Sequence, residues 1–263
     1  MTTTAVVTGA GRGIGLAIAH RLRAAGHLVV VTDVDREAAE RAAAEVGGGA
    51  VGLEQDVRDL ASADAVAAVA AEHGRVAVWV NNAGVLFAGD AWAHPDDELT
   101  TILDVNVRGV ISGSAAAVRT MGSDGGRILN IASISALTPV PGLALYAATK
   151  AAVLSYTTSL EGDLRHAGLP ITVKALCPDV VGTHMVTSRE NDPHAAMLFS
   201  GPKPLDTDTV AAAAMSLLDS RQTFRVVPRW RGVVARSADV APSVTGGALA
   251  LMRRLGERRQ SRG

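Results

Sequence analysis

The sequence has little of several features that mark particular classes of protein. It contains one cysteine, Cys177, which excludes an intramolecular disulfide framework and a zinc site built on cysteines. No stretch reaches the ~20 uninterrupted apolar residues of a membrane-spanning helix. The first residues show no basic region followed by an apolar run, so no secretory signal is visible. We therefore expect a cytoplasmic protein.

Charge of one sign and aromatic residues are also scarce. The 25 basic and 26 acidic residues nearly cancel, so we expect no nucleic-acid partner. Aromatic residues make up 3% of the chain. No metal is assigned, because metal-ligand spacing is missing among the seven histidines, at positions 20, 27, 73, 94, 166, 184 and 194.

What the sequence does contain is a regular alternation of short Val- and Ile-rich runs with longer Ala-, Arg- and Glu-containing segments. The runs predict strands at 5–7, 28–32, 50–53, 76–80, 127–131, 171–176 and 224–227. The longer segments predict helices at 14–25, 35–46, 60–73, 99–121, 145–167 and 209–219. The runs are almost continuously apolar, as burial on both faces of a parallel sheet requires. We therefore predict one doubly wound α/β domain over residues 1–228, with about seven parallel strands and helices on both faces.

A glycine-rich turn, Thr8 to Gly15, lies between the first strand and the first helix. Glycines can adopt positive φ and let a phosphate approach the backbone at a helix start. The spacing of Gly9, Gly13 and Gly15 fits neither Gly-x-Gly-x-x-Gly nor a P-loop. A tight turn without a ligand is the alternative. Asp33 lies 18 positions past Gly15, near the place where a carboxylate meets the adenosine ribose, and it favours NAD over NADP.

A second pair, Tyr146 and Lys150, is spaced four residues apart in a predicted helix and therefore shares one helix face. A free tyrosine titrates near ~10, and an ammonium 4 Å away stabilises the phenolate by ~4 kcal/mol at an effective dielectric of ~20. We expect the pKa of Tyr146 to be lowered, which would make it a general base in one direction and an acid in the other. A surface lysine beside a half-buried tyrosine is the alternative.

Together with three further motifs, these residues resemble the short-chain dehydrogenase/reductase family of the Tyr-x-x-x-Lys type. The motifs are Asn81-Asn82-Ala83-Gly84, Asn106 within 104–109, and Ser133, which stands 13 residues before Tyr146. The resemblance covers about residues 4–185 and implies a Rossmann-type fold. Taken singly, Ser133 could be an ordinary loop hydroxyl, the Asn-Gly motif a turn, and Asn106 a solvent-facing residue.

The resemblance also implies roles for these residues. Ser133 would bind the substrate oxygen, Tyr146 would exchange its proton, and Lys150 would hold the nicotinamide ribose. Asn106 would position a water that links Lys150 to solvent. Arg12 could pair with a phosphate. The implied cofactor-binding residues are Gly9, Arg12, Gly13, Ile14, Gly15, Asp33, Asp56, Val57, Asn82, Ala83, Gly84, Tyr146, Lys150, Pro178, Val181 and Thr183.

The segment 184–205 takes the position of the family's substrate lid. We predict substrate contacts from Ser133, Leu143, Tyr146 and Met185; with Leu86, Phe87 and Val140 they would form a mostly apolar pocket. Asp179 stands where the family usually has glycine, which would alter the turn over the nicotinamide and favour the oxidised, cationic ring.

A C-terminal extension, 229–263, follows the last predicted strand. Its final twelve residues carry five arginines against one glutamate, which favours a solvated basic tail over an amphipathic helix at a membrane surface or an oligomer contact. The family resemblance implies a homodimer or homotetramer packed through segments 99–121 and 145–167.

The combined interpretation is an NAD-dependent short-chain alcohol dehydrogenase/carbonyl reductase acting on a hydrophobic secondary alcohol or ketone. Two alternatives stay open at this point. One is a catalytically silent NAD-binding sensor, and the other is a non-redox epimerase or dehydratase on the same scaffold.

Overall fold

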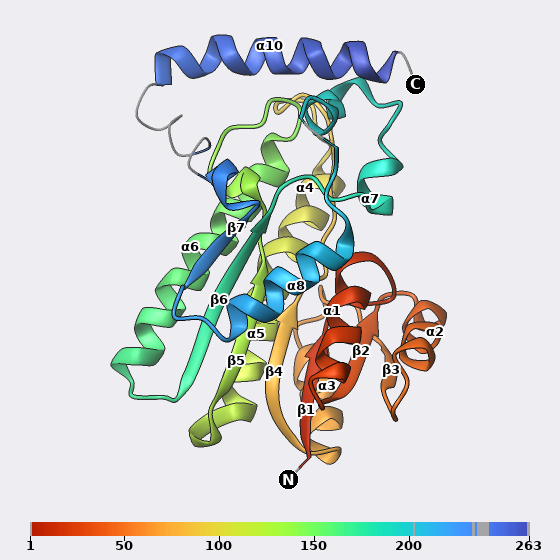
Figure 1. Ribbon diagram of the computed structural model, residues 1–263, viewed down its shortest axis with the longest axis vertical. Helices are drawn as coiled ribbons and strands as arrows, with labels where there is room; N and C mark the ends of the chain where they lie inside the picture. The colour runs from red at the N-terminus through yellow and green to blue at the C-terminus, as the bar shows by residue number, and fades with distance from the viewer. Residues whose placement is uncertain (1, 202, 233–234, 236–241, 262–263) are drawn as a thin grey trace.

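The computed structural model describes residues 2–201, 203–232, 235 and 242–261. Its centre is a parallel seven-stranded sheet with the strand order β3-β2-β1-β4-β5-β6-β7 (Figure 1). The strands are β1 (Thr3–Val7), β2 (Leu28–Asp33), β3 (Val51–Glu54), β4 (Arg75–Asn81), β5 (Gly126–Ile131), β6 (Ile171–Pro178) and β7 (Phe224–Val227). The doubly wound Rossmann-type fold predicted from the sequence is confirmed.

Helices cover both faces of this sheet. One core contains residues of α1 (Gly13–Ala24), α2 (Arg36–Val46) and α8 (Thr207–Leu218). The opposite core contains residues of α3 (Ser62–Glu72), α5 (Gly109–Met121) and α6 (Ala144–His166). The remaining elements are α4 (Asp96–Leu103), α7 (His184–Thr187), α10 (Pro242–Gln260) and the short turns η1 (Asp104–Arg108), η2 (Gly122–Asp124), η3 (Ile134–Ala136) and η4 (Pro193–Phe199).

The first strand illustrates why a short apolar run becomes a central strand. Ala5, Val6 and Val7 are all fully buried. Ala5 and Val7 belong to the core with α1, α2 and α8, whereas Val6 belongs to the opposite core. Because successive side chains of a strand point to opposite faces, a sheet covered on both sides needs apolar residues at every position.

The strand order reverses between β1 and β4. The chain continues from β1 to β2 on one side and from β4 to β5 on the other, so the two connections diverge. A crevice opens at such a point beside the carboxyl ends of the strands. Thr8 follows β1 there and Asn82 follows β4, which places the glycine turn beside the Asn-Gly motif.

The segment between β6 and α8 leaves the central domain and returns to it at the same place. Val181 pairs with Leu205 in an isolated parallel bridge. The Gly182 N–H donates to the Leu205 carbonyl, and the Leu205 N–H donates to the Val180 carbonyl, both at 2.9 Å. The segment predicted as a lid, 184–205, lies between these contacts and contains α7 and η4.

Most predicted boundaries agree with the structure within two residues. The helix predicted over 99–121 is found, beginning three residues earlier: α4, a π-helical turn over Asp104–Arg108 and α5 follow one another without a gap. The π turn itself was not predicted, since such a turn inside a helix has no sequence signal of its own. Gly26, Gly74 and Gly168, which follow α1, α3 and α6, adopt positive φ, at 95°, 144° and 69°.

Residues 252–260 of the expected solvated basic tail form the last part of a helix, α10 (Pro242–Gln260), in which positions 254, 255 and 257–259 are exposed and Gly256 is buried. Proline suits the first position of a helix, because the N–H that it lacks would have no helical partner there. Two glycines, at 246 and 247, disfavour a helix, so the sequence pattern did not predict one here. In the part of the chain that is described, no helix is both long and apolar enough to cross a membrane. The domain division at residue 228 stays a prediction.

Candidate active site

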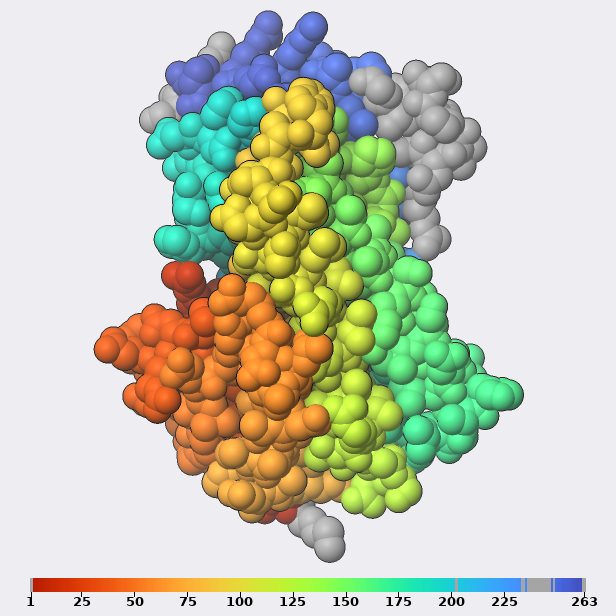
Figure 2. All heavy atoms as spheres, turned by 180° about the vertical axis from the view of Figure 1, so that it is seen from behind, coloured from red at the N-terminus to blue at the C-terminus, as the bar shows by residue number. Residues whose placement is uncertain are grey.

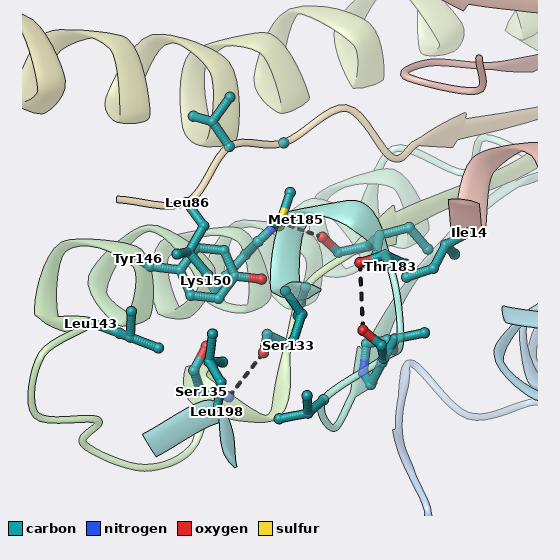
Figure 3. Close-up of a pocket in the computed structure, with 18 of the residues that line it drawn as sticks. Ile14, Leu86, Ser133, Ser135, Leu143, Tyr146, Lys150, Thr183, Met185 and Leu198 are labelled. Carbon is teal, nitrogen blue, oxygen red and sulfur yellow. Dashed lines mark hydrogen bonds between the residues drawn. The ribbon is translucent and has the colours of Figure 1, made fainter. Parts of the chain in front are cut away.

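A cavity of about 1250 Å³ lies at the carboxyl ends of the central strands. Its walls include every predicted substrate-binding residue, namely Ser133, Leu143, Tyr146 and Met185 (Figure 3). They also include the predicted cofactor residues Gly9, Arg12, Gly13, Ile14, Asp33, Asp56, Val57, Asn82, Ala83, Gly84, Lys150, Pro178, Val181 and Thr183. Gly15 and Asn106 are the two predicted site residues that do not line it.

The glycine turn packs directly against the loop that follows β4. Gly9 has φ 59°, and a Cβ atom there would lie 2.6 Å from the Cα of Ala83. A Cβ on Gly15 would lie 2.5 Å from the side-chain nitrogen of Asn82 and 2.7 Å from the Gly9 carbonyl oxygen. Gly15 therefore permits the close packing behind the turn, while Gly9 and Gly13 face the cavity.

The N-terminus of α1, which opens onto this turn, has no capping side chain. Arg12 occupies the N-cap position without a side-chain hydrogen bond, and the first turn contains no acidic residue. Asp35 caps α2 and Asp206 caps α8, whereas α3, α4 and α6 have no side-chain cap either, so α1 differs from these in that its start opens onto the glycine turn. Uncapped N–H groups at a helix start favour an anion such as a phosphate. These residues therefore fit a dinucleotide.

Asp33 lies at the end of β2 and has a fixed orientation. One carboxylate oxygen accepts the Gly11 N–H at 3.0 Å, and the other accepts the Asp35 N–H at 3.2 Å. Each oxygen has a further lone pair that can accept another hydrogen bond. At the neighbouring wall, Asp56 forms an ion pair with Arg58 at 2.6 Å, and hydrogen bonding to that guanidinium holds the pKa of Asp56 below its usual value.

The loop after β4 is hydrogen-bonded on both of its sides. The Asn82 amide nitrogen donates to the carbonyls of Thr8 at 3.0 Å and Gly9 at 2.8 Å. Three residues later, the Val85 N–H donates to Asn106 Oδ1 at 2.8 Å, and Asn106 Nδ2 donates back to the Val85 carbonyl at 2.9 Å. The amide of Asn82 thus braces the glycine turn, while the residue still forms part of the cavity wall.

Asn106 lies in the π-helical turn and is fully buried, so the solvent-facing alternative is wrong. Its Nδ2 also donates to the Thr149 hydroxyl at 3.1 Å, next to Lys150. A Cβ on Gly84 would lie 3.4 Å from Asn106 Oδ1 and 3.6 Å from Lys150 Nζ. Asn106 therefore supports the wall near Lys150 from behind, and its predicted link to a water stays a prediction.

Helix α6 presents Tyr146 and Lys150 on the same face, as their spacing predicts (Figure 3). Lys150 Nζ lies 5.6 Å from the centre of the Tyr146 ring and donates to the Ile131 carbonyl at 2.9 Å. Ser133, which follows β5 after one residue, has its hydroxyl fixed as an acceptor from the Ser135 N–H at 3.2 Å. The Ser133 side chain also lowers the pKa of the Tyr146 hydroxyl. The predicted trio is therefore brought together.

Burial changes the acidity of both α6 groups. It raises the pKa of Tyr146 from 10.0 to about 12, although the Ser133 side chain opposes the change. It also lowers the pKa of Lys150 from 10.5 to about 8. The lowered tyrosine pKa expected from the sequence is therefore wrong for the protein by itself. The free-energy cost of removing a phenolate from water is larger than its electrostatic stabilisation by the nearby amine. Burial also disfavours the charged form of that amine.

The turn after β6 differs from the sequence-based expectation in two ways. Among the residues described, only glycines adopt positive φ, so Asp179 causes no backbone strain. Its carboxylate accepts two hydrogen bonds from Arg231, at 2.6 Å from Nε and 3.3 Å from Nη2. Because this ion pair balances the charge of Asp179, the expected preference for an oxidised ring loses its electrostatic basis.

Sequence reasoning missed several residues of the cavity wall. Ser135 is buried, and its hydroxyl has no hydrogen-bond partner in the described part of the protein. Arg189 Nη2 donates to the Leu86 carbonyl at 2.9 Å and ties the lid segment to the loop after β4. Leu249 and Met252 reach the wall from α10. Only Ser135 stood near a recognised motif, and none of the four has a diagnostic spacing.

The low pKa of Lys150 predicts how the stability of the protein changes with pH. The unfolded chain binds more protons than the folded one between pH 8 and 10.5, so this group makes the protein more stable as pH rises through that window. Methionine does not titrate. We therefore expect the difference in unfolding free energy between wild type and Lys150→Met to change by up to about 2 kcal/mol from pH 8 to pH 10. Urea unfolding at both pH values measures this change.

The exposed Lys203 provides the control for that comparison. Lys203→Met should differ from wild type by the same amount at pH 8 and pH 10. A Lys150→Met difference that is equally independent of pH would contradict the assigned pKa.

Comparison with known proteins agrees with this geometry. Residues 3–194 match the family model described as short chain dehydrogenase. The chain is 35% identical over 192 residues to the probable oxidoreductase EphD of Mycobacterium tuberculosis; the match covers 71% of this chain and 32% of EphD, about a third of that relative's length. It is 34% identical over 183 residues to the 3-beta-hydroxysteroid dehydrogenase of Comamonas testosteroni, covering 69% of this chain and 72% of the relative.

A solved structure is similar over nearly the whole chain. It is a short chain dehydrogenase/reductase from Burkholderia phymatum in complex with NAD, with a TM-score of 0.84 and 27% sequence identity, covering 92% of this chain and 95% of that one. Family model, relatives and fold agree with one another. The chain therefore belongs to the short-chain dehydrogenase/reductase family of oxidoreductases.

Proposed function

We propose that the protein transfers a hydride between NAD(H) and a hydrophobic secondary alcohol or ketone. The observation that carries this proposal is the meeting of Ser133, Tyr146 and Lys150 in one cavity with the glycine turn and the uncapped start of α1. A protein that only sensed the cofactor would need no such trio. The name of the Comamonas relative denotes a hydroxysteroid substrate, which is itself an apolar secondary alcohol.

Tyr146 and Ser133 have different roles in this reaction. A bound nicotinamide supplies or accepts the hydride. Tyr146 donates its hydroxyl proton to the carbonyl oxygen during reduction and takes a proton from the alcohol during oxidation. Ser133 donates a hydrogen bond to the same oxygen, where negative charge develops. Since burial keeps Tyr146 protonated at neutral pH, the protein by itself is ready for the reductive direction.

The choice of NAD rests on Asp33. Its carboxylate is fixed at the end of β2 by two backbone N–H groups and lies at the wall of the cavity. A carboxylate there accepts hydrogen bonds from ribose hydroxyls and repels a 2′-phosphate. Arg12 and Arg58 also line the cavity, but Arg58 is paired with Asp56.

A homo-oligomer formed through the long helices is part of the proposal. Apolar side chains are exposed on α4 and α5, with Leu103 at 43% and Ile111 at 40%. Along α6, exposed alanines at 148, 151 and 152 permit close approach of a second helix. Figure 2 shows α4, α5 and α6 side by side on one face of the molecule. The cytoplasmic location stays a prediction.

Tyr146→Phe tests the mechanism. We expect it to lower the rate of NADH formation from secondary alcohols at least 100-fold, because the proton acceptor is lost. The dissociation constant for NAD should change less than twofold. Tyr156→Phe, at the other tyrosine of the chain and outside the cavity, should keep wild-type activity.

Three outcomes separate the candidate functions. A Tyr146→Phe enzyme with the wild-type rate would contradict the mechanism. Wild-type protein that binds NAD but never reduces it would indicate a sensor. Substrate conversion without net change in NADH absorbance would indicate an epimerase or dehydratase.

Asp33→Asn tests the cofactor assignment. Removing the negative charge should lower the ratio of kcat/KM with NAD to kcat/KM with NADP at least tenfold, because the 2′-phosphate is no longer repelled. The control is Asp97→Asn, which neutralises an exposed carboxylate outside the cavity. If the ratio is the same in both variants, Asp33 does not select the cofactor.

Leu103→Arg combined with Ile111→Arg tests the interface. Two charges placed in an apolar contact should dissociate the oligomer, since burying unpaired charges is costly. Light scattering coupled to size exclusion would then give the mass of a single chain. Leu251→Arg changes an exposed leucine on α10 and should leave the mass unchanged. A wild-type protein that is already a monomer would exclude the proposed interface.

A further inference from the structure

The C-terminal helix α10 lies across the end of the molecule at which the strands finish. Figure 1 shows it above the segment that contains α7 and η4, with its axis across the sheet. Helix α10 follows the last strand. None of its described residues belongs to the sheet or to either of the two large cores. What it does cover is the lid segment.

Close contacts fix the last turns of α10 on η4. Gly256 is buried, and a Cβ atom there would lie 1.9 Å from the Ala196 carbonyl oxygen, so a larger residue would separate the two elements. Arg259 donates to the carbonyls of Phe199 and Gly201. Gln260 Nε2 donates to the Asp192 carbonyl at 2.9 Å.

The chain is anchored a second time where the extension begins. Arg231 pairs with Asp179, which follows β6, and both side chains are largely buried, with 18% and 9% exposed. A buried ion pair with two hydrogen bonds has a defined geometry. The Arg231 pair and the α10 contacts therefore hold the extension at both of its described ends.

One face of α10 forms part of the cavity wall. Leu249 and Met252 line the same cavity as Ser133 and Tyr146, whereas Leu251 and Leu255 are 60% and 41% exposed. Positions 249, 252 and 256 follow the spacing of one helix face. The face with Gly256 thus packs on η4 and continues into the cavity.

Much of the cavity wall that the lid segment contributes is apolar. Met185, Met197 and Leu198 line the cavity there, together with the polar Ser188, Arg189 and Ser200. Figure 3 draws Leu198 and Met185 in the same cavity as Ser133 and Tyr146. Because α10 packs on η4 and the cavity has a volume of about 1250 Å³, Leu249 and Met252 belong to a part of the wall that a small alcohol held at Tyr146 does not fill.

We infer that Leu249 and Met252 form the far end of the substrate site, and that the substrate carries an apolar chain or ring system long enough to reach them. The inference rests on the proposed function, because that function places the reacting oxygen at Ser133 and Tyr146. Leu249 and Met252 are specificity residues: they contact the distal part of the substrate and take no part in the proton transfer.

Secondary alcohols of different length provide the probes. Each buried methylene strengthens binding by about fourfold. Calorimetric titration of the full chain with NADH, with which an alcohol cannot react, should therefore give a dissociation constant for 2-decanol at least tenfold below that for 2-hexanol. Met252→Trp fills the far end and should weaken 2-decanol binding at least tenfold, while 2-hexanol binding changes less than twofold.

Leu255→Trp is the matched control, since it adds the same side chain three residues away on the exposed face. It should leave both dissociation constants unchanged. The large tryptophan of Met252→Trp could displace α10. Met252→Ala is therefore a second variant, because it removes contacts without adding bulk. It should weaken 2-decanol binding at least threefold and leave 2-hexanol binding unchanged.

The outcomes separate this inference from the proposed function. Equal effects of Met252→Trp and Leu255→Trp, or no preference of wild type for 2-decanol, would overturn the inference even if alcohols are oxidised. Binding of 2-decanol that depends on Met252 but yields no NADH would support the inference and overturn the proposed oxidation.

Discussion

The site depends on the hydrogen bonds that hold the loop after β4 between two partners. On one side Asn82 donates to the carbonyls of Thr8 and Gly9. On the other, Asn106 exchanges two hydrogen bonds with the backbone of Val85. This loop therefore fixes the position of the glycine turn relative to the π-helical turn and to α6. The adjacency of β1 and β4 in the sheet makes the arrangement possible.

Burial has opposite effects on the two groups that α6 contributes. Burial raises the pKa of Tyr146 and lowers the pKa of Lys150, so both groups favour their neutral forms. Lys150 also donates a hydrogen bond to the Ile131 carbonyl, which fixes the position of its amine. A cationic ring nearby would favour the phenolate, which would couple the acidity of Tyr146 to the oxidation state of a bound cofactor.

The sequence predicts the sheet and its helices well, because burial on both faces leaves a clear pattern in strands such as 5–7 and 171–176. The convergence of Ser133, Tyr146 and Lys150 also follows from spacing and resemblance. Three features were beyond it. The π turn at 104–108 lies inside a helix and has no sequence signal of its own, and the ion pair of Arg231 with Asp179 joins residues 52 positions apart. Helix α10 lacks a strong pattern, since its stability comes from contacts such as Gly256 on Ala196.

The bridge between Val181 and Leu205 has a consequence for how this protein can diversify. The stretch between those residues departs from and rejoins the framework at a single point, where backbone hydrogen bonds hold it and Val181 and Leu205 pack in the core. Backbone pairing is indifferent to side-chain identity. The intervening stretch can therefore be lengthened, shortened or exchanged during evolution while β6 and α8 stay where they are, as long as α10 changes in concert with it.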